Sequence, residues 1–484
     1  MRRLRRLLLI ALAALLVAAA AIAGLGYWQA RSIVDQLQAG AKHAEVVGAR
    51  RQLAVEPKHR LLAPKVEQAR GAQTILLIGS DHRSRTAGDD KHSDTIILAR
   101  IDATHHRISL LSIPRDLYVP IAGHGMDRIN DAFTYGGPAL LIRTVRETFG
   151  VRIDHFVEVN FAGFRKLVDT LGGIYLPVDQ RYYNRNVGTL ATDYSDIDLE
   201  PGYQKLNGAQ ALAYARFRHT DSDFYRAARQ QVFLRAVLGD LLTFTPDLLA
   251  LRDRAEAFAK ATTSDISSLS ELWWLFRAVH GTPTANLTRT TLQAQDLSLY
   301  GAFYLSATED ERRTAVEALY TAPHRVAPAA TSRALARAAG PPAAQPPGLV
   351  PDGGRGAALV APLVPIRRCA PTVIPSGYWW PSQDPARSYV LAGHPAIAAW
   401  VTAGSGRSVL FTWTTWRDPP ALDSPTTSLR RGARRYEVWT EHGRIRQLAW
   451  SIGPTRVWIT NTLLDELTNR QMIGLAQGCA PVGR

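Results

Sequence analysis

The chain has 484 residues, of which 46% are hydrophobic and 20% are charged, and its formal net charge is +15 at pH 7. This length suffices for two or three packed domains, and the composition excludes an intrinsically disordered chain. A strongly positive chain could bind nucleic acid, but anionic lipids, pyrophosphate groups and acidic polymers attract the same charge. The side of the membrane on which the basic residues lie decides between these partners, because a chain outside the cytoplasm does not meet nucleic acid.

An apolar segment near the N-terminus predicts a membrane anchor. Four arginines precede an uninterrupted apolar run from Leu7 to Leu25, and Tyr27 and Trp28 follow it. About 20 such residues span the hydrocarbon core of a bilayer, and the arginines stay on the cytoplasmic side. We therefore expect residues 1–28 to form a cytoplasmic tip and an uncleaved single-pass anchor in the cell membrane, with the bulk of the chain extracytoplasmic and away from nucleic acid. A cleaved signal peptide is the alternative.

Composition divides the remaining chain into four parts. Residues 29–70 mix charged and apolar positions without a strong period, which favours a partly helical stalk. Residues 71–322 alternate short β-type runs with helical stretches, among them Pro138 to Phe149 and around Pro246 to Thr262, which predicts an α/β domain with a mixed central sheet flanked by helices. Residues 323–368 are rich in Ala and Pro and predict a linker. Residues 369–484 carry four strand-like runs and a final helix, which predicts a small α+β accessory domain. The runs are Ser388 to Leu391, Val409 to Trp416, Tyr436 to Thr440 and Arg456 to Thr460, and the helix is Leu463 to Ala476.

The only two cysteines, Cys369 and Cys479, lie on the predicted external side. An oxidising compartment permits a disulfide bond between them. Closing a loop of roughly 110 residues would stabilise this region by up to about 4.7 kcal/mol in the chain-entropy model. Two unrelated buried thiols are the alternative.

Three consecutive strand-like runs place acidic and basic residues at one sheet edge. The runs cover Thr74 to Ile78, Thr95 to Ile101 and Arg107 to Ile113. An antiparallel meander is the simplest arrangement for short consecutive strands. It brings three charged residues to one edge: Asp81, Asp94 and Arg115. Such an edge suits Mg²⁺, which prefers oxygen ligands, beside a phosphate that arginine can contact with two N–H groups. Local turn caps and an Arg115–Asp116 pair are the structural alternative.

A second cluster of cations lies between Tyr214 and Gln230. It contains four arginines: Arg216, Arg218, Arg226 and Arg229. Arg216 and Arg218 share a face of an extended segment, and Arg226, Arg229 and Gln230 share a face of the following helix. Because four guanidinium groups repel one another, we expect an anion such as pyrophosphate among them.

These motifs, in order and spacing, resemble the LytR-CpsA-Psr family. The matching segments are Leu77-Ile78-Gly79-Ser80-Asp81-His82-Arg83, Ser93-Asp94-Thr95, Ser112-Ile113-Pro114-Arg115-Asp116, Gly172-Gly173 and the Arg-Phe-Arg-His block that ends at Arg229-Gln230. The resemblance spans roughly Thr74 to Leu242. Each motif alone is weak, whereas the ordered set is specific.

The resemblance implies a mixed sheet between helices, a hydrophobic pocket for a polyprenyl chain and a pyrophosphate site at its mouth. It implies transfer of a glycopolymer from a polyprenyl-pyrophosphate carrier to peptidoglycan or its attached sugars, with Mg²⁺, or Mn²⁺ in its place, as cofactor. The Arg- and Ala-rich composition favours, by analogy with high-GC bacteria, an arabinogalactan-type acceptor. Asp81 and Asp94 match the metal-associated positions of the family. Its phosphate-contacting positions match Arg83, Arg115, Arg216, Arg218, Arg226 and Gln230. Tyr225, where the family commonly has Gly, and His82 depart from the pattern.

The expected reaction is attack by a wall hydroxyl on the phosphorus next to the sugar. Arginines would stabilise the charge of the departing lipid phosphate. Asp94 and Asp223 are the candidate general bases, and His219 is a weaker one. Two other functions fit the same residues: hydrolysis of the lipid pyrophosphate by water, and non-catalytic wall binding or regulation through residues 369–484.

Overall fold

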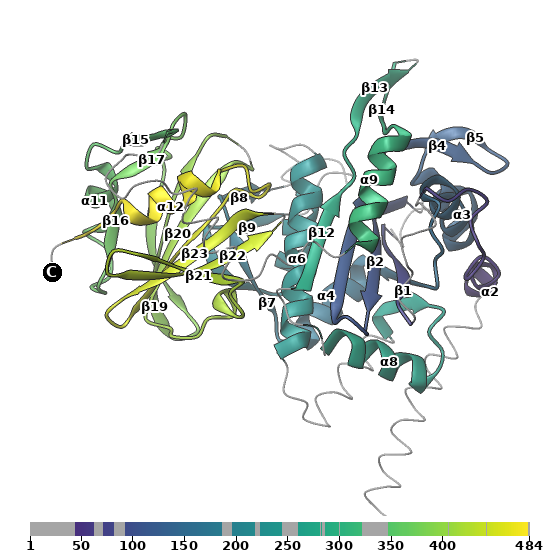
Figure 1. Cartoon of the computed structure of the whole chain (residues 1–484), viewed down its shortest axis with the longest axis horizontal. Coiled ribbons are helices and arrows are strands. Elements are labelled where there is room, and N and C mark those ends of the chain that lie inside the picture. Colours follow the sequence, from purple (N-terminus) through teal and green to yellow (C-terminus); the bar gives the residue numbers. More distant parts are fainter. Residues whose placement is uncertain are drawn as a thin grey trace, which may run out of the picture.

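The computed structural model describes residues 44–61, 71–81, 92–185, 196–217, 223–243, 260–280, 282, 286–299, 301–321, 347–404, 406–441 and 443–482. The predicted anchor and much of the predicted stalk lie outside these ranges. Within them, no helix combines the length and the apolar character that crossing a membrane requires. The described chain forms two packed units, an α/β unit with a mixed sheet and a C-terminal β-rich unit (Figure 1).

A mixed sheet of six strands forms the centre of the α/β unit, in the order β11-β6-β1-β2-β3-β12. The strands are β1 (Gln73–Asp81), β2 (His92–Asp102), β3 (Arg107–Ile113), β6 (His155–Asn160), β11 (Thr262–Ser264) and β12 (Leu287–Thr291). β2 runs antiparallel to β1 and to β3, which confirms the predicted meander. β6 lies parallel to β1, and β12 lies parallel to β3. The carboxyl ends of β1, β3, β6 and β12 therefore meet at one edge.

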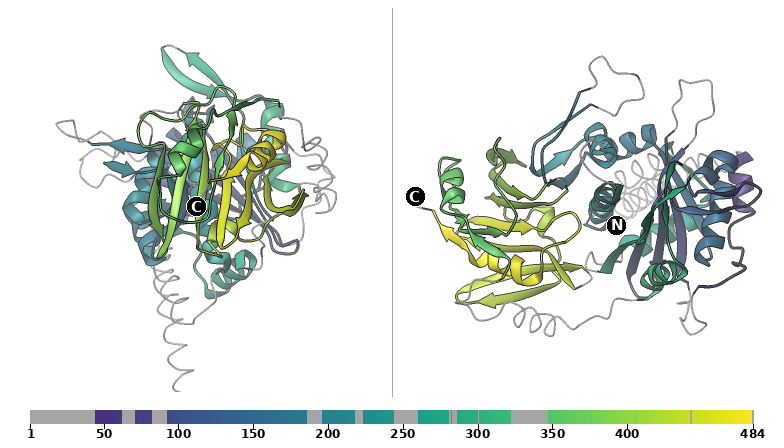
Figure 2. Two further views of the ribbon diagram at one scale, coloured as in Figure 1. Left: turned by 90° about the vertical axis from the view of Figure 1, so that its left-hand side faces the viewer. Right: turned by 90° about the horizontal axis from the view of Figure 1, so that it is seen from above.

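Helices cover both faces of this sheet (Figure 2). Leu76 and Ile78 point into a core formed with α2 (Ala44–Arg50), α3 (Asp131–Phe149) and α9 (Glu309–Tyr320). Ile75 and Ile97 point to the opposite face, which α6 (Asp223–Thr243) and α8 (Leu269–His280) cover. This alternation follows from the two-residue period of a strand. α4 (Phe161–Thr170) and α5 (Gly208–Arg216) complete the layer around α6.

Four two-stranded sheets extend from the α/β unit. They are β4 (Tyr118–Ile121) with β5 (Gly125–Arg128), β7 (Ile174–Val178) with β10 (Gly202–Leu206), β8 (Tyr182–Asn184) with β9 (Ile197–Leu199), and β13 (Gln295–Leu299) with β14 (Ala302–Ser306). The β7–β10 pair lies outside the central sheet and faces the C-terminal unit, where β10 contacts strands β19 and β20.

An antiparallel sheet of seven strands forms the C-terminal unit, in the order β18-β19-β20-β24-β23-β22-β21. Its strands are β18 (Ala386–Leu391), β19 (His394–Thr402), β20 (Ser408–Thr414), β21 (Thr427–Arg431), β22 (Arg434–Glu441), β23 (Arg444–Ile452) and β24 (Thr455–Thr460). Cys369 and Cys479 are joined by a disulfide bond between the short paired strands β16 (Cys369–Pro371) and β25 (Cys479–Pro481). The predicted bridge is therefore present.

The C-terminal unit begins upstream of the predicted boundary at residue 368. The strand β15 (Leu349–Pro351) pairs with β17 (Val373–Pro375), and the helix α11 (Arg355–Val360) follows it. Leu349 and Val360 are buried in the same core as the large sheet. Part of the range 323–368 is consequently structured chain, because its few apolar residues pack under the sheet.

An aromatic cluster joins the two units. Tyr203 of β10 packs edge-on against Trp458, and Tyr175 of β7 packs against Trp416. Gly202 lies so close to Ala398 and Arg387 that a Cβ atom there would make tight contacts with both. Burial of large aromatic rings is a strong source of packing energy, so the units form a continuous core.

Some predicted elements differ from those observed. α3 begins at Asp131 because residues before Gly136 form a first helical segment, which the non-helical Gly136 and Gly137 separate from the remainder. The predicted C-terminal helix from Leu463 begins later, as α12 (Asn469–Gln477), with Thr468 as its N-cap. The sequence did not predict three strands of the C-terminal sheet: β19, β21 and β23. The helix predicted from residue 246 lies mostly outside the described residues.

Candidate functional site

The candidate site lies at the edge where the carboxyl ends of the parallel strands meet. Asp81 ends β1 and pairs through its backbone with His92, while Ser80 pairs with Ser93 and Gly79 with Thr95. Asp94 is therefore the extra residue of a β-bulge. A bulge bends a strand and redirects a side chain. Here it lies at the start of β2, opposite the end of β1, and it sets the direction of the Asp94 side chain at this edge. In α/β sheets, ligands bind outside the carboxyl ends of strands.

Asp94 and Arg115 meet across this edge, as the meander predicts. Nη1 of Arg115 donates a hydrogen bond to Oδ1 of Asp94 at 2.6 Å, and the two side chains are 18% and 21% exposed. Arg115 also lies 3.4 Å from Oδ2 of Asp116, so the local pair coexists with the long-range one. Because both members keep solvent access, a ligand can reach them.

Two buried oxygen atoms at the same edge lack hydrogen-bond partners within the described part of the chain. They are Oγ of Ser93, next to the bulge, and Oδ1 of Asn130, whose backbone N–H bonds to the carbonyl of Arg115. Buried polar groups are normally paired. The edge therefore offers carboxylate, hydroxyl and amide oxygens, the donor types that Mg²⁺ prefers. The residues present fit this metal, and the sequence patterns had not singled out Ser93 or Asn130.

An acidic pair at the start of α3 lies near His92. Burial and the charge of neighbouring Asp127 raise the pKa of Asp131 to about 6. Tyr135 donates a hydrogen bond to Asp127, and that bond raises the pKa of Tyr135 to about 12. Asp127 and Asp131 interact through a hydrogen bond of their own. A carboxyl group that titrates near pH 6 is thus present close to the edge, and no sequence pattern had indicated it.

Arg216 reaches the same region from α5. Its guanidinium lies 3.9 Å from the ring centre of Phe161, the first residue after β6, and β6 ends beside Ser80 of β1. Arg216 is the last residue of α5, so the predicted extended geometry does not apply to it. A cation–π contact of this kind holds the guanidinium in place without neutralising its charge.

The predicted ligands on α6 differ in burial: Arg226 and Arg229 are both buried, whereas Gln230 is partly open to solvent. Arg226 is 7% exposed and Gln230 is partly exposed. Arg229 is fully buried: Nε donates to the carbonyl of Tyr214 at 3.0 Å and Nη2 donates to the carbonyl of Phe217. These carbonyls belong to the end of α5, where helix acceptors lack internal partners. Arg229 therefore joins α5 to α6, contrary to the prediction that it contacts pyrophosphate.

Several predicted site residues lie outside the described part of the chain. These are His82, Arg83, Arg218 and His219, and the side chains of Asp81 and Asp223. Their roles remain predictions from the sequence.

Comparison with known proteins identifies the family of the chain. Residues 32–320 match the model of the LytR-CpsA-Psr family, which is more than half of the chain. The chain belongs to the LytR-CpsA-Psr family.

Three similar proteins illustrate the relationship. An uncharacterised protein of Staphylococcus aureus is 33% identical over 243 residues, which cover 48% of this chain and 57% of that protein. A Corynebacterium glutamicum protein named probable cell wall biosynthesis protein LcpB is 38% identical over 176 residues, which cover 34% of this chain and 40% of the relative. The crystal structure of Bacillus subtilis TagV matches with 27% identity and a TM-score of 0.45, covering 52% of this chain and 98% of TagV. The chain spans about half the length of the curated relatives that it matches.

Proposed function

We propose that this LytR-CpsA-Psr protein is a membrane-anchored, extracytoplasmic transferase. It moves a glycopolymer from a polyprenyl-pyrophosphate carrier onto peptidoglycan or an attached cell-wall polysaccharide. The observation that carries this proposal is the solvent-accessible Asp94–Arg115 pair at the carboxyl edge of the sheet, beside oxygens of Ser93 and Asn130 that have no hydrogen-bond partner among the described residues. The name of the Corynebacterium relative, a cell wall biosynthesis protein, supports the same process.

The reaction requires a site for two phosphates and a path for one proton. The acceptor hydroxyl forms a new P–O bond to the phosphorus that bears the sugar, and the P–O bond to the lipid phosphate breaks. The hydroxyl proton passes to a carboxylate, for which Asp94 and Asp223 are the candidates. Polyprenyl phosphate leaves with the bond electrons. Arg115 and Arg216, joined by Arg226, are the groups that would stabilise its charge in the transition state.

Mg²⁺ would be held by Asp94, Asp81 and the neighbouring edge oxygens, where it would supply a positive charge close to the pyrophosphate. Arg115 then has two tasks. In the described geometry it orients the carboxylate of Asp94, and with donor bound its guanidinium would contact a phosphate oxygen. Loss of Arg115 therefore removes a phosphate contact and releases Asp94.

The carrier's lipid requires an apolar surface next to this edge. On the sheet face that α6 covers, Leu77 of β1, Val159 of β6 and Leu234 of α6 are only partly buried, and Val159 lies next to the carboxyl end of its strand. Partly exposed apolar groups of this kind gain stability when a hydrocarbon chain covers them. The disulfide bond supports an extracytoplasmic location, because such bonds persist in oxidising compartments.

The test measures transfer of a labelled sugar from a synthetic polyprenyl-pyrophosphate donor to peptidoglycan fragments, with and without Mg²⁺. We expect metal-dependent linkage that Arg115→Ala reduces by about 100-fold or more, the cost of losing one transition-state charge contact. Arg128→Ala is the matched control, because Arg128 also pairs with Asp116 but donates mainly to the carbonyl of Phe303.

Two outcomes would contradict the transferase. Release of polyprenyl phosphate without linkage would indicate a hydrolase that uses water as the nucleophile. Donor binding without any reaction, unaffected by Arg115→Ala, would indicate a binding or regulatory protein.

A further inference from the structure

The C-terminal unit contacts α6, the helix that carries Arg226 and Gln230, at three levels. At the start of α6, the loop between β19 and β20 touches Tyr225. A Cβ atom on Gly406 in that loop would overlap the Tyr225 ring. Arg407 in the same loop pairs with Glu466 at 3.1 Å. Glycine at 406 thus makes room for the aromatic ring at 225.

Midway along the helix, the contact is apolar. Val232 is buried in one cluster with Leu463 of the C-terminal unit. Val232, Leu463 and Leu410 also line a small cavity between the units, together with polar residues of the neighbouring ion cluster. The cores of the two units are continuous at this level.

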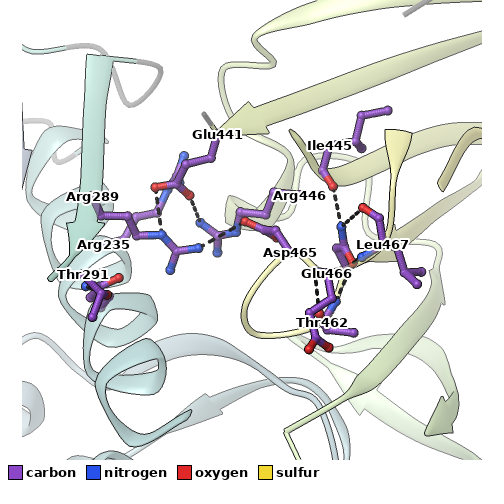
Figure 3. A network of polar contacts seen from close by, with 12 residues as sticks. Arg235, Arg289, Thr291, Glu441, Ile445, Arg446, Thr462, Asp465, Glu466 and Leu467 are labelled. Carbon is purple, nitrogen blue, oxygen red and sulfur yellow. Dashed lines mark hydrogen bonds and ion pairs between the residues drawn. The ribbon is translucent and has the colours of Figure 1, made fainter. Parts of the chain in front are cut away.

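Farther along α6, a buried ion cluster makes the third contact (Figure 3). Oε2 of Glu441 lies 3.2 Å from Nη1 of Arg235, and Oε1 lies 2.8 Å from Nε of Arg289 on β12. The Glu441 side chain is 5% exposed. Arg446 and Asp465 of the C-terminal unit complete the cluster, with Asp465 lying 3.6 Å from Arg289. One carboxylate therefore links α6, β12 and the C-terminal sheet.

These contacts and the predicted ligands Arg226 and Gln230 lie on different sides of α6. At about 100° per residue, Tyr225, Val232 and Arg235 fall on one side of α6. Gln230 lies about 140–160° around the helix from each of them, and Arg226 lies about 100–180° from them. The α/β unit also holds α6, through the hydrogen bonds of Arg229 and through Gln231, which donates a hydrogen bond to Oγ1 of Thr291 at 2.8 Å. The C-terminal unit supplies the remaining support.

We propose that the C-terminal unit is a positioning element of the donor site. Its contacts with Tyr225 and Arg235 hold α6 on the side away from the predicted ligands. They thereby set the distance of Arg226 and Gln230 from Arg115 across the sheet edge. Gly406 and Glu441 are the positioning residues. This inference rests on the proposed function, because it assigns the helix to pyrophosphate binding.

The first test changes the contact at Tyr225. Full-length protein in detergent micelles is titrated with farnesyl pyrophosphate and MgCl₂ by calorimetry, which yields both the Kd and the number of sites. We expect Gly406→Ala to raise the Kd about tenfold, equivalent to about 1.4 kcal/mol. Gly404→Ala is the matched control: Gly404 also has a positive φ of 111°, but a Cβ atom there meets nothing within 4 Å. It should change the Kd by no more than about twofold.

Rescue separates positioning from general damage. Adding Tyr225→Ala to Gly406→Ala removes the overlap, so the double variant should bind about as tightly as Tyr225→Ala alone. A lower number of sites with an unchanged Kd would mean partial misfolding and would overturn the inference. So would equal losses in the Gly404 and Gly406 variants.

The second test changes the contact at Arg235. Glu441→Gln should raise the Kd for farnesyl pyrophosphate about fivefold, because the helix loses a charged anchor. Glu437→Gln on the same strand is the control, since Glu437 pairs with Arg456 within the C-terminal unit. If wild-type protein does not bind farnesyl pyrophosphate, the proposed function and this inference both fall. If it binds and both glutamate variants bind equally well, only the inference falls.

Discussion

Two arginine–carboxylate clusters of this protein differ in their access to solvent. At the sheet edge, Arg115 and Asp94 are 18% and 21% exposed. Between the two units, Arg289 and Glu441 are 9% and 5% exposed. Protein carboxylates and packed side chains enclose the second cluster, whereas the first remains open. Clustered arginines are therefore not by themselves evidence of an anion site, because the fold decides how far a ligand can reach them.

The enclosed cluster also shows the cost of burial. Burial, together with the charges of Arg235 and Arg289, lowers the pKa of Arg446 to about 9. Burial raises the pKa of Asp465 to about 6 despite the nearby arginines. Removing one member of a buried ionic group destabilises a protein much more than removing an exposed pair does. The two clusters should therefore respond to mutation in opposite ways, in stability and in activity.

The largest loss of stability is expected for Arg229→Met. This change leaves the carbonyls of Tyr214 and Phe217 without their donor inside the core. We expect a loss of about 4 kcal/mol in the free energy of unfolding, measured by urea denaturation. Arg181→Met, which removes an arginine that is 43% exposed and pairs with Asp198, should cost less than about 1 kcal/mol. Comparable losses in the two variants would contradict the structural role of Arg229.

A smaller loss is expected for Arg289→Met. Glu441 would keep Arg235 and Arg446, so the buried carboxylate stays partly compensated. We expect a loss of about 2–3 kcal/mol in the free energy of unfolding. Urea denaturation of Arg289→Met and wild type measures this loss. A loss below that of Arg181→Met would show that the enclosed cluster contributes nothing to docking of the two units.

The partly buried pair of His155 and Asp265 should make the stability of the fold depend on pH. Burial lowers the pKa of its imidazole, but the hydrogen bond at 2.7 Å to Asp265 and the charge of that carboxylate outweigh burial and raise it. The pair therefore stabilises the fold fully below the ordinary histidine pKa, and this contribution is lost as pH rises through the raised value. The free energy of unfolding, measured by urea denaturation, should be about 1 kcal/mol higher for wild type than for His155→Gln at pH 5.5, and the difference should be smaller at pH 8.5. A difference that grows with pH would exclude this assignment.

The smallest loss of stability is expected for Arg115→Ala. Its ion pairs are accessible to water, so the free energy of unfolding should fall by less than about 1 kcal/mol. Transfer activity should nevertheless fall most in this variant. Thermal unfolding combined with the transfer assay checks both parts. A large stability loss would mean that the edge cluster is structural, as the enclosed one is.

The sequence by itself determined the meander, its charged edge and the family. Alternating apolar residues require strands with two buried faces, and short consecutive strands pair with their neighbours, so Asp94 and Arg115 had to meet. The order of the motifs indicated the same edge as the pyrophosphate site. These conclusions depend on local periodicity and on neighbouring elements, which a sequence records directly.

Only the tertiary structure decided which arginines could bind a ligand. Arg226 and Arg229 lie on one helix three residues apart, and no local pattern shows that Arg229 bonds to the end of α5. Nor does the sequence show that Gly406, about 180 residues after Tyr225, fits against its ring, or that Glu441 reaches Arg235 and Arg289. Burial and charge pairing arise when distant segments pack together, and that packing distinguishes an enclosed structural cation from one that solvent can reach.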